Sequence, residues 1–228
     1  MRICGLQKTT LLDYPGKVAC TVFLGGCNFR CPFCQNSEIL SAASPAAYTQ
    51  DELFAFLQKR RGILEGVCVS GGEPLLHEEA EGLLKKIKAL GYCVKVDTNG
   101  SFPARLKKLC AAGLVDFVAM DIKNSPAKYA QTCGATVELA AVRESAAFLL
   151  EGGVDYEFRT TVADELHTEE DMEEIGAWLA GAKRFYLQNF RDAETVLCPG
   201  LHPCSEKKLQ AFRAVLRRTI PEAKIRGE

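Results

Sequence analysis

The sequence has almost no excess charge and no long apolar run, and each absence removes a class of function. Its 28 Lys and Arg residues nearly balance 29 Asp and Glu residues, which gives a formal net charge of −1. Because a dedicated nucleic-acid-binding protein usually carries a basic excess, we expect no nucleic-acid partner. No apolar run approaches the ~18 residues of a membrane helix, and the first residues, MRICGLQKTT, contain no apolar signal-peptide segment. We therefore expect no membrane span and no export.

The chain also lacks internal repeats, low-complexity segments and Pro/Gly/Ser-rich linkers. Its 228 residues, of which 47% are hydrophobic, are enough for one domain with a substantial core. We therefore predict a single domain over residues 1–228, with an N-terminal extension over 1–17 and a core over 18–219.

Cysteine, in contrast, is abundant. The 11 cysteines are an odd number in a chain without an export signal, which favours free thiols in a reducing cytoplasm over a disulfide framework. Cys20, Cys68 and Cys93 lie in apolar strings and are typical of buried cysteines that pack as small apolar side chains.

Short apolar runs alternate with longer amphipathic runs along the chain. The apolar runs are rich in Val, Phe and Tyr and predict strands buried on both faces. They span residues 18–24, 66–71, 92–98, 115–123, 156–162 and 184–190. The amphipathic runs predict helices over about 50–61, 77–90, 103–112, 137–151, 168–180 and 205–219. This strict alternation predicts an α/β fold with a mostly parallel sheet, in the form of a partial, open (β/α)6 TIM-like barrel.

Three cysteines, Cys27, Cys31 and Cys34, follow the first predicted strand with the spacing C-x3-C-x2-C. That position is the carboxyl end of a parallel strand, where active sites of such folds collect. A structural zinc site needs four ligands, so it would require a distant fourth ligand such as Cys198, Cys204 or His202. A cubane iron–sulfur cluster also normally takes four thiolates. With three thiolates, one iron stays open for a substrate or cofactor, and we favour this interpretation.

Two motifs resemble those of the radical S-adenosylmethionine (SAM) enzymes. CNFRCPFC at residues 27–34 matches the cysteine motif of that superfamily, and SGGEP at residues 70–74 matches its second motif. The resemblance implies a [4Fe-4S] cluster on Cys27, Cys31 and Cys34. Its open iron would chelate SAM, and reductive cleavage of SAM would give a 5′-deoxyadenosyl radical that abstracts hydrogen.

The residues around these motifs suit a bound nucleoside and amino acid. Gly71 and Gly72 would let the backbone approach a ligand closely. Glu73 would accept hydrogen bonds from a ligand ammonium group. Phe33 would form an aromatic wall beside an adenine, and Gln35 would contact the same nucleoside. Because Glu73 lies in a turn, an ordinary structural acid is the alternative.

The chain further resembles the activating enzymes of glycyl-radical enzymes, and above all the anaerobic ribonucleoside-triphosphate reductase activating proteins. The matching blocks are LLDYPGKVACTVFLGGCNFRCPFCQN, VDTNG, MDIK, FRTTV and YLQNFR, between about residues 5 and 215. The resemblance implies a glycyl-radical partner, most simply anaerobic ribonucleotide reductase. No cluster-binding insert lies between the cysteine loop and SGGEP, so we expect an external electron donor such as flavodoxin or ferredoxin.

The same resemblance implies a monovalent cation beside the SAM carboxylate. Asp97 and Asp121 would hold it, with the backbone of Thr98 and Ala119. Two facing carboxylates repel one another unless a cation or a shared proton lies between them, and hard oxygen ligands suit such an ion. The alternative for Asp97 is a turn-forming residue ahead of Thr98.

Three basic residues complete the predicted site. Lys123 lies on the same strand face as Asp121 and would pair with the SAM carboxylate or ribose. Arg159 would pair with a carboxylate through its planar guanidinium. Structural ion pairs are the alternative for both. Arg191 stands where pyruvate formate-lyase activating enzyme has a histidine that touches SAM, and this departure leaves its role open.

Two rival functions remain on the sequence alone. The protein can be a radical SAM enzyme that acts on another glycyl-radical enzyme, a peptide, a small molecule or a tRNA base. It can also be a zinc- or iron-binding regulatory module that is not an enzyme, although SGGEP and the charged residues at several strand ends argue against this.

Overall fold

Eight strands form one sheet in the computed structural model, which describes residues 1–227. They follow one another across the sheet in chain order: β1 (Ile3–Thr10), β2 (Ala19–Leu24), β3 (Gly66–Gly71), β4 (Cys93–Thr98), β5 (Phe117–Asp121), β6 (Asp155–Val162), β7 (Phe185–Asn189) and β8 (Ala223–Ile225). β1 runs antiparallel to β2, and every later pair is parallel. Because β1 and β8 are the two edges, the barrel is open, which confirms the predicted fold class.

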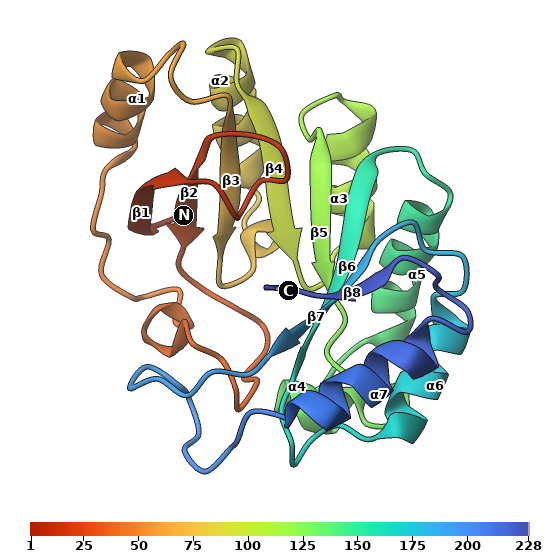
Figure 1. The fold of residues 1–228 in the computed structure, drawn as a ribbon. Coiled ribbons are helices and arrows are strands. Elements are labelled where there is room, and N and C mark those ends of the chain that lie inside the picture. The colour runs from red at the N-terminus through yellow and green to blue at the C-terminus, as the bar shows by residue number, and fades with distance from the viewer. Residues whose placement is uncertain (228) are drawn as a thin grey trace.

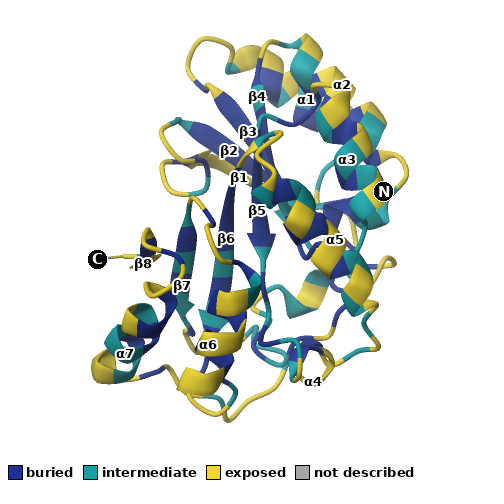
Figure 2. Ribbon diagram, turned by 90° about the vertical axis from the view of Figure 1, so that its right-hand side faces the viewer, coloured by how far each residue is buried: buried dark blue, intermediate teal, exposed yellow. Residues whose placement is uncertain are grey.

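The helices flank the curved sheet and turn their exposed faces outward, whereas the strands are mostly buried (Figures 1 and 2). They are α1 (Gln50–Lys59), α2 (Ala80–Ala89), α3 (Pro103–Ala111), α4 (Tyr129–Cys133), α5 (Leu139–Leu150), α6 (Glu169–Trp178) and α7 (Glu206–Leu216), with short 3-10 turns at Ser37–Ile39 and Pro74–Leu76. The buried positions are spaced as an amphipathic helix requires, as with Leu53 and Leu57 in α1. No helix within residues 1–227 is long and apolar enough to cross a membrane.

The start of α6 shows how local sequence sets an element boundary. The Thr168 hydroxyl accepts a hydrogen bond from the Asp171 backbone amide, and the Asp171 side chain in turn accepts one from the Thr168 amide. This reciprocal capping box satisfies amide groups that have no partner inside the helix. It confirms the helix start predicted at residue 168.

Two strands and one helix escaped the sequence prediction. β1 lies within the segment predicted as an N-terminal extension, and its middle residues are half-buried or exposed. β8 is three residues long and lies beyond residue 219, and α4 is five residues long. Such elements are too short or too polar to give a clear hydrophobic period.

The interior of the barrel contains charge as well as apolar side chains. Val67, Cys68 and Val69 are consecutive and fully buried in β3, as predicted for a strand covered on both faces. Lys95 in β4 and Glu157 in β6 are also fully buried. Because a buried charge is costly unless it is paired, these two residues indicate an ionic network inside the barrel.

Candidate functional site

The predicted site residues gather at the carboxyl ends of the parallel strands. The loop after β2 carries the three cysteines, and it lies near the loop that follows β7 at the lower end of the sheet in Figure 1. Side-chain contacts join this loop to its neighbours. The Asn99 Nδ2 atom after β4 donates to Asn28 Oδ1 at 2.8 Å, and the Asn36 Nδ2 atom donates to the Gly71 carbonyl at 3.1 Å. Sequence analysis missed all three asparagines because their partners are distant in the chain.

The cysteine loop is a compact turn in which one backbone amide donates to a cysteine sulfur. The Cys34 amide donates to the Cys31 carbonyl at 3.0 Å, and the Phe29 amide donates to Cys27 Sγ at 3.4 Å. The Cys27 amide donates a hydrogen bond to the Leu40 carbonyl at 3.0 Å. Amide groups that point at sulfur stabilise the thiolate form, which is the form that binds metal.

The ionisation of the three thiols differs. Burial raises the pKa of Cys27 to about 11 and also raises the pKa of Cys34. A hydrogen bond with the Cys133 thiol lowers the pKa of Cys31 despite its burial. The Lys123 ammonium group lowers the pKa of all three cysteines and is the positive charge that they share. Binding of metal at this loop would therefore release protons.

The donor set suits a cluster better than a single ion. Two sulfurs bound to one zinc ion lie within about 4.6 Å of each other, since each Zn–S bond is about 2.3 Å. Within residues 1–227, no three His, Cys, Asp or Glu side chains gather closely enough to hold one metal ion. A cubane places each thiolate on a different iron, so its ligands lie farther apart. Three thiols on one loop, with amide donors beside them, fit that arrangement.

The residues considered as a distant zinc ligand differ in their surroundings. The His202 Nδ1 atom pairs with Glu165 Oε1 at 2.6 Å. Cys204 is buried, and its amide donates to Asn189 Oδ1 at 2.9 Å, whereas Cys198 is exposed. These side chains therefore offer no gathered donor set for a metal.

The glycines of the GGEP turn serve contacts between chain segments. Gly71 has φ = +119°, and a Cβ atom there would lie 2.4 Å from the Leu24 backbone. A Cβ atom on Gly72 would lie 2.0 Å from the Gly26 carbonyl oxygen. The glycines thus let the turn after β3 pack directly on the loop that begins the cysteine motif. Their predicted approach to a ligand stays a prediction.

Glu73 is fully buried and points toward the chain rather than into open space. Its carboxylate accepts hydrogen bonds from the Asn99 amide at 2.6 Å, the Thr98 hydroxyl at 2.8 Å and the Leu75 amide at 2.9 Å. Burial nevertheless raises the pKa of Glu73 to about 7. The carboxylate therefore fixes the ends of β3 and β4, which is the turn-acid alternative. A ligand ammonium would compete with these three donors.

Asp97 and Asp121 lie on either side of a guanidinium group. The Arg159 Nε atom donates to Asp121 Oδ1 at 2.9 Å, and its NH1 atom donates to Asp97 Oδ2 at 3.4 Å. Burial raises the pKa of each carboxyl group, but the Arg159 charge, together with Lys95 at Asp97 and Lys123 at Asp121, holds both pKa values below their usual range. Arg159 thus supplies the positive charge that two facing carboxylates need. The monovalent cation stays a prediction that no contact here tests.

Two further ion pairs in the barrel were missed by the sequence analysis. The Lys95 ammonium group pairs with Asp97 and lies 3.7 Å from Cys68 Sγ. Arg226, just after β8, binds both oxygens of Glu157 at 2.8 Å. A lysine between apolar strand residues and an arginine at the far end of the chain carry no motif, so only the fold reveals them.

Lys123 connects the cysteine loop with β5. Its Nζ atom donates to Asp121 Oδ2 at 3.1 Å and lies 5.9 Å from the centroid of the Phe33 ring. His167, which is fully buried, fixes the backbone here, because its Nε2 atom is 3.0 Å from the Lys123 carbonyl oxygen. Phe33 is itself buried, so the ring that the cysteine loop turns toward Lys123 lies within the core.

A segment after β7 covers the cysteine loop. We call residues 191–198 the covering segment. The Leu197 amide donates to the Cys34 carbonyl at 3.1 Å, and the Cys198 amide donates to the Pro32 carbonyl at 2.9 Å. The Gln35 side chain donates to the Arg191 carbonyl at 2.8 Å. Gln35 thus holds the covering segment, while the Arg191 side chain is exposed.

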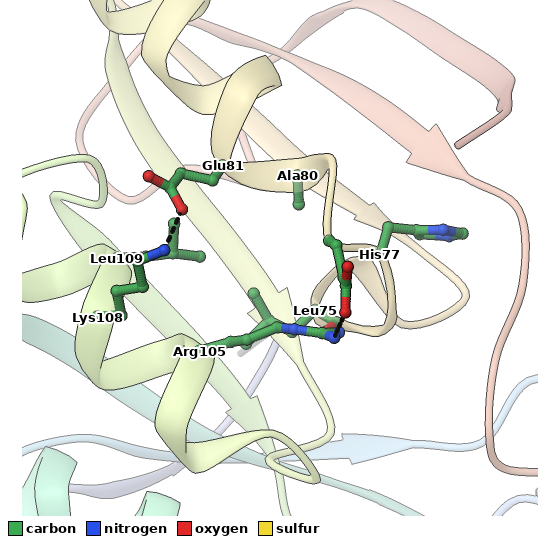
Figure 3. A pocket seen from close by; sticks show the side chains of 8 residues that line it. Leu75, His77, Ala80, Glu81, Arg105, Lys108 and Leu109 are labelled. Carbon is green, nitrogen blue, oxygen red and sulfur yellow. Dashed lines mark hydrogen bonds and ion pairs between the residues drawn. The ribbon is translucent and has the colours of Figure 1, made fainter.

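The hollow drawn in Figure 3 lies apart from the cysteines. It has a volume of about 260 Å³ and lies between α2 and α3, with lining residues that include His77, Glu81, Arg105 and Lys108. The charges there pair with one another: Lys108 with Glu81 at 2.6 Å, and Arg105 with Glu78 at 3.3 Å. These pairs leave no free charge for a ligand, so the hollow is a poor second site.

Comparisons with known proteins identify the family to which the chain is similar. The sequence model of the radical SAM superfamily matches residues 21–179. A Methanocaldococcus jannaschii protein named "Putative glycyl-radical enzyme activating enzyme" is 27% identical over 231 residues, which cover 98% of this chain and 95% of that protein. A 7-carboxy-7-deazaguanine synthase of Halobacterium salinarum is 39% identical, but over only 40% of this chain and 36% of its own length.

Solved structures show the same fold. A domain of pyruvate-formate lyase-activating enzyme from Bacteroides vulgatus has a TM-score of 0.59 at 22% identity, and covers 71% of this chain and 99% of that domain. Streptococcus suis SuiB bound to S-adenosylmethionine has a TM-score of 0.70 at 14% identity, and covers 91% of this chain and 52% of SuiB. At these identities the likeness is one of fold.

Proposed function

The chain belongs to the radical SAM superfamily, whose cofactors are a [4Fe-4S] cluster and S-adenosylmethionine, and from that premise we propose that it installs a glycyl radical on a partner enzyme. The observation that carries this proposal is the alignment with the archaeal activating-enzyme relative over 98% of this chain. The match to the deazaguanine synthase covers 40% of the chain and supports only the shared cofactor region.

We propose anaerobic ribonucleoside-triphosphate reductase as the partner and flavodoxin or ferredoxin as the electron donor. The partner rests on the sequence blocks VDTNG, MDIK, FRTTV and YLQNFR. The external donor rests on the short span between Cys34 and β3, which contains one 3-10 turn, α1 and no second cysteine-rich insert. We place the reaction in a reducing cytoplasm because the 11 cysteines of the chain are all free.

The cysteine loop would hold the cluster through Cys27, Cys31 and Cys34. When bound and reduced, the cluster supplies the electron that cleaves SAM. Lys123 favours the thiolate forms of the three ligands through its nearby charge. The covering segment is hydrogen-bonded along one side of the loop, and it would restrict access of water from that side. One sheet provides these elements, which is the basis for proposing a single radical SAM domain.

The other charged residues would orient SAM. Arg159 offers a planar fork for a carboxylate, and it is already fixed by Asp97 and Asp121. Phe33 would pack against the nucleoside beside the cysteine loop. These roles are proposals that rest on position at one edge of the sheet.

The first experiment measures SAM cleavage. The protein is reconstituted anaerobically with iron and sulfide, reduced with dithionite and incubated with SAM, and 5′-deoxyadenosine is quantified. Each of Cys27→Ala, Cys31→Ala and Cys34→Ala is expected to abolish cleavage, whereas Cys110→Ala in α3 serves as the matched control. Retained cleavage in all three loop variants would exclude the assignment. A zinc-loaded protein that ignores SAM would support a regulatory module.

A second experiment identifies the substrate class. After cleavage-competent protein is mixed with an anaerobic ribonucleotide reductase, we expect a glycyl-radical signal in the electron paramagnetic resonance (EPR) spectrum. Abundant 5′-deoxyadenosine without that signal, together with hydrogen loss from a purine-like small molecule, would favour the small-molecule class instead.

A further inference from the structure

A fourth cysteine, Cys133, lies against the cysteine loop at the end of α4. The Arg30 amide, inside the C-x3-C spacing, donates to the Cys133 carbonyl at 2.8 Å. The next residue, Gly134, has φ = +58°, and a Cβ atom there would lie 2.3 Å from the Arg30 carbonyl oxygen. The end of α4 and the loop are therefore in direct backbone contact.

The side chains of this contact are also paired. Cys133 is fully buried and Cys31 is 6% exposed, and both belong to the main core. The two thiols are near enough to affect each other's ionisation, since Cys133 lowers the pKa of Cys31 and Cys31 raises the pKa of Cys133. α4 is held in place independently, since the Asn124 side chain donates to the Thr132 hydroxyl at 2.8 Å and the Tyr129 hydroxyl donates to the Asp121 carbonyl at 3.4 Å. The Cys133 thiol is thus fixed beside one predicted cluster ligand.

We propose that Cys133 is a positioning residue whose S–H group donates a hydrogen bond to the Cys31 thiolate of the bound cluster and raises the cluster's reduction potential. This inference rests on the cluster that the proposed function assigns to Cys27, Cys31 and Cys34. Reduction adds one negative charge to the cluster and its thiolates. A donor to a ligand sulfur stabilises the more negative state, and such donors are among the features that set cluster potentials.

The same position argues against ligation by Cys133. A fourth thiolate on the cluster would close the iron that SAM must reach. Cys133 instead contacts a cysteine that is itself a ligand, and its carbonyl is engaged with the loop backbone. A donor to sulfur keeps the vacant iron position open.

The test compares three substitutions of Cys133. Cys133→Ala removes the donor, Cys133→Val removes it while filling the space, and Cys133→Ser keeps an O–H donor. Cys20→Ala, at a fully buried cysteine in β2, is the matched control. Iron and sulfide are quantified for each reconstituted protein, and the midpoint potential is measured by redox titration followed by EPR, without SAM or partner.

The Ala and Val variants are expected to load a full cluster with a more negative potential. At a fixed potential near the wild-type midpoint, their ratio of reduced to oxidised cluster should fall about threefold to tenfold, where tenfold corresponds to about 59 mV for a one-electron couple. The Ser variant and Cys20→Ala should stay near the wild-type value.

Three results would overturn the inference. The first is an unchanged potential in Cys133→Ala and Cys133→Val. The second is an equal shift in Cys133→Ser, which would point to packing. The third is loss of iron from both the Ala and the Val variants while wild type and Cys133→Ser load normally, which would make Cys133 a ligand or a folding requirement. If wild type itself binds no cluster, the proposed function fails rather than this inference.

Discussion

The Arg159 Nε atom donates a 2.9 Å hydrogen bond to Asp121 Oδ1 across the neighbouring strands β6 and β5. Because the same guanidinium also reaches Asp97 on β4, it joins three strand ends at the candidate site. The contact is made by the protein's own side chains, so its contribution can be measured on the cofactor-free protein.

Arg159→Met should destabilise the cofactor-free protein strongly. Removing one partner of a buried ion pair leaves uncompensated charge and costs about 3–5 kcal/mol. Urea denaturation at pH 7 measures the loss. Arg184→Met is the control, because Arg184 is more exposed and its nearest acid, Asp155, is 3.9 Å away. An equal, small loss in both variants would show that the Arg159 contacts contribute little.

The same pairs predict acid sensitivity. The pKa values of Asp97 and Asp121 are depressed in the folded protein, so their stabilising contribution is present above the unfolded value of about 3.9 and is lost as the pH falls below it. The wild-type free energy of unfolding should therefore fall more steeply from pH 5 to pH 3 than that of Arg159→Met. Parallel pH profiles would contradict this prediction.

Glu73 should have the opposite effect on the pH dependence of stability, because it should destabilise the folded protein as the pH rises. Its pKa is raised from 4.5 to about 7 by burial, so the folded state binds the proton more tightly than the unfolded state does. The associated stability is fully present below pH 4.5 and is lost as the pH rises through about 7, by roughly 3 kcal/mol. The free energy of unfolding, measured between pH 5 and pH 8, should decline less in Glu73→Gln than in wild type. A decline of the same size in both proteins would remove Glu73 as the cause.

Gly134→Ala should damage the cysteine loop through the backbone. A residue with a Cβ atom at positive φ costs about 1–2 kcal/mol wherever it occurs. Gly113 has φ = +66°, and a Cβ atom there would meet nothing within 4 Å, whereas a Cβ atom on Gly134 would lie 2.3 Å from the Arg30 carbonyl oxygen. Thermal unfolding should therefore show a larger loss for Gly134→Ala than for Gly113→Ala. Gly134→Ala should also bind less iron than wild type, whereas Gly113→Ala should not. Equal iron binding by the two variants would argue that the cysteine loop tolerates the displaced backbone.

Arg226 should be required for the barrel interior. It binds both oxygens of Glu157, whose side chain is 1% exposed. Arg226→Met should lower the free energy of unfolding by about 3–5 kcal/mol, because it leaves a buried carboxylate without its partner. The double variant Glu157→Met with Arg226→Met should recover most of that loss. Urea denaturation of the two single variants and the double variant forms a double-mutant cycle. Additive losses would show that the two side chains are not coupled.

The sequence was most informative where the signal lies within one short stretch of the chain. The runs at 18–24 and 66–71 predicted β2 and β3 because consecutive apolar residues are buried on both faces. The cysteine spacing, SGGEP and MDIK singled out residues that the structure places at the carboxyl ends of the strands. These signals are local, and the parallel α/β fold brings their strand ends to one edge.

Contacts between residues that lie far apart in the chain could not be predicted from a single sequence. The predicted hydrogen bonds from a ligand ammonium group to Glu73 stay a prediction, and only the fold reveals that its oxygens also accept from Thr98, Asn99 and Leu75. Cys133 and Arg226 belong to no motif, and their roles depend on where α4 and β8 pack. The same limit applies to Arg159, whose position between two carboxylates is a property of three strands together.

The chain order of the sheet also sets the order in which the protein can be made. Each strand pairs with the one before it, so the sheet can grow from its N-terminal edge while the chain is still being synthesised. The cysteine loop follows β2, whereas the covering segment follows β7. A nascent chain therefore presents its three thiols uncovered on a half-built sheet, and it shields them only when the last quarter of the polypeptide has left the ribosome. Delivery of iron has the widest access during that interval, and so does damage by oxygen.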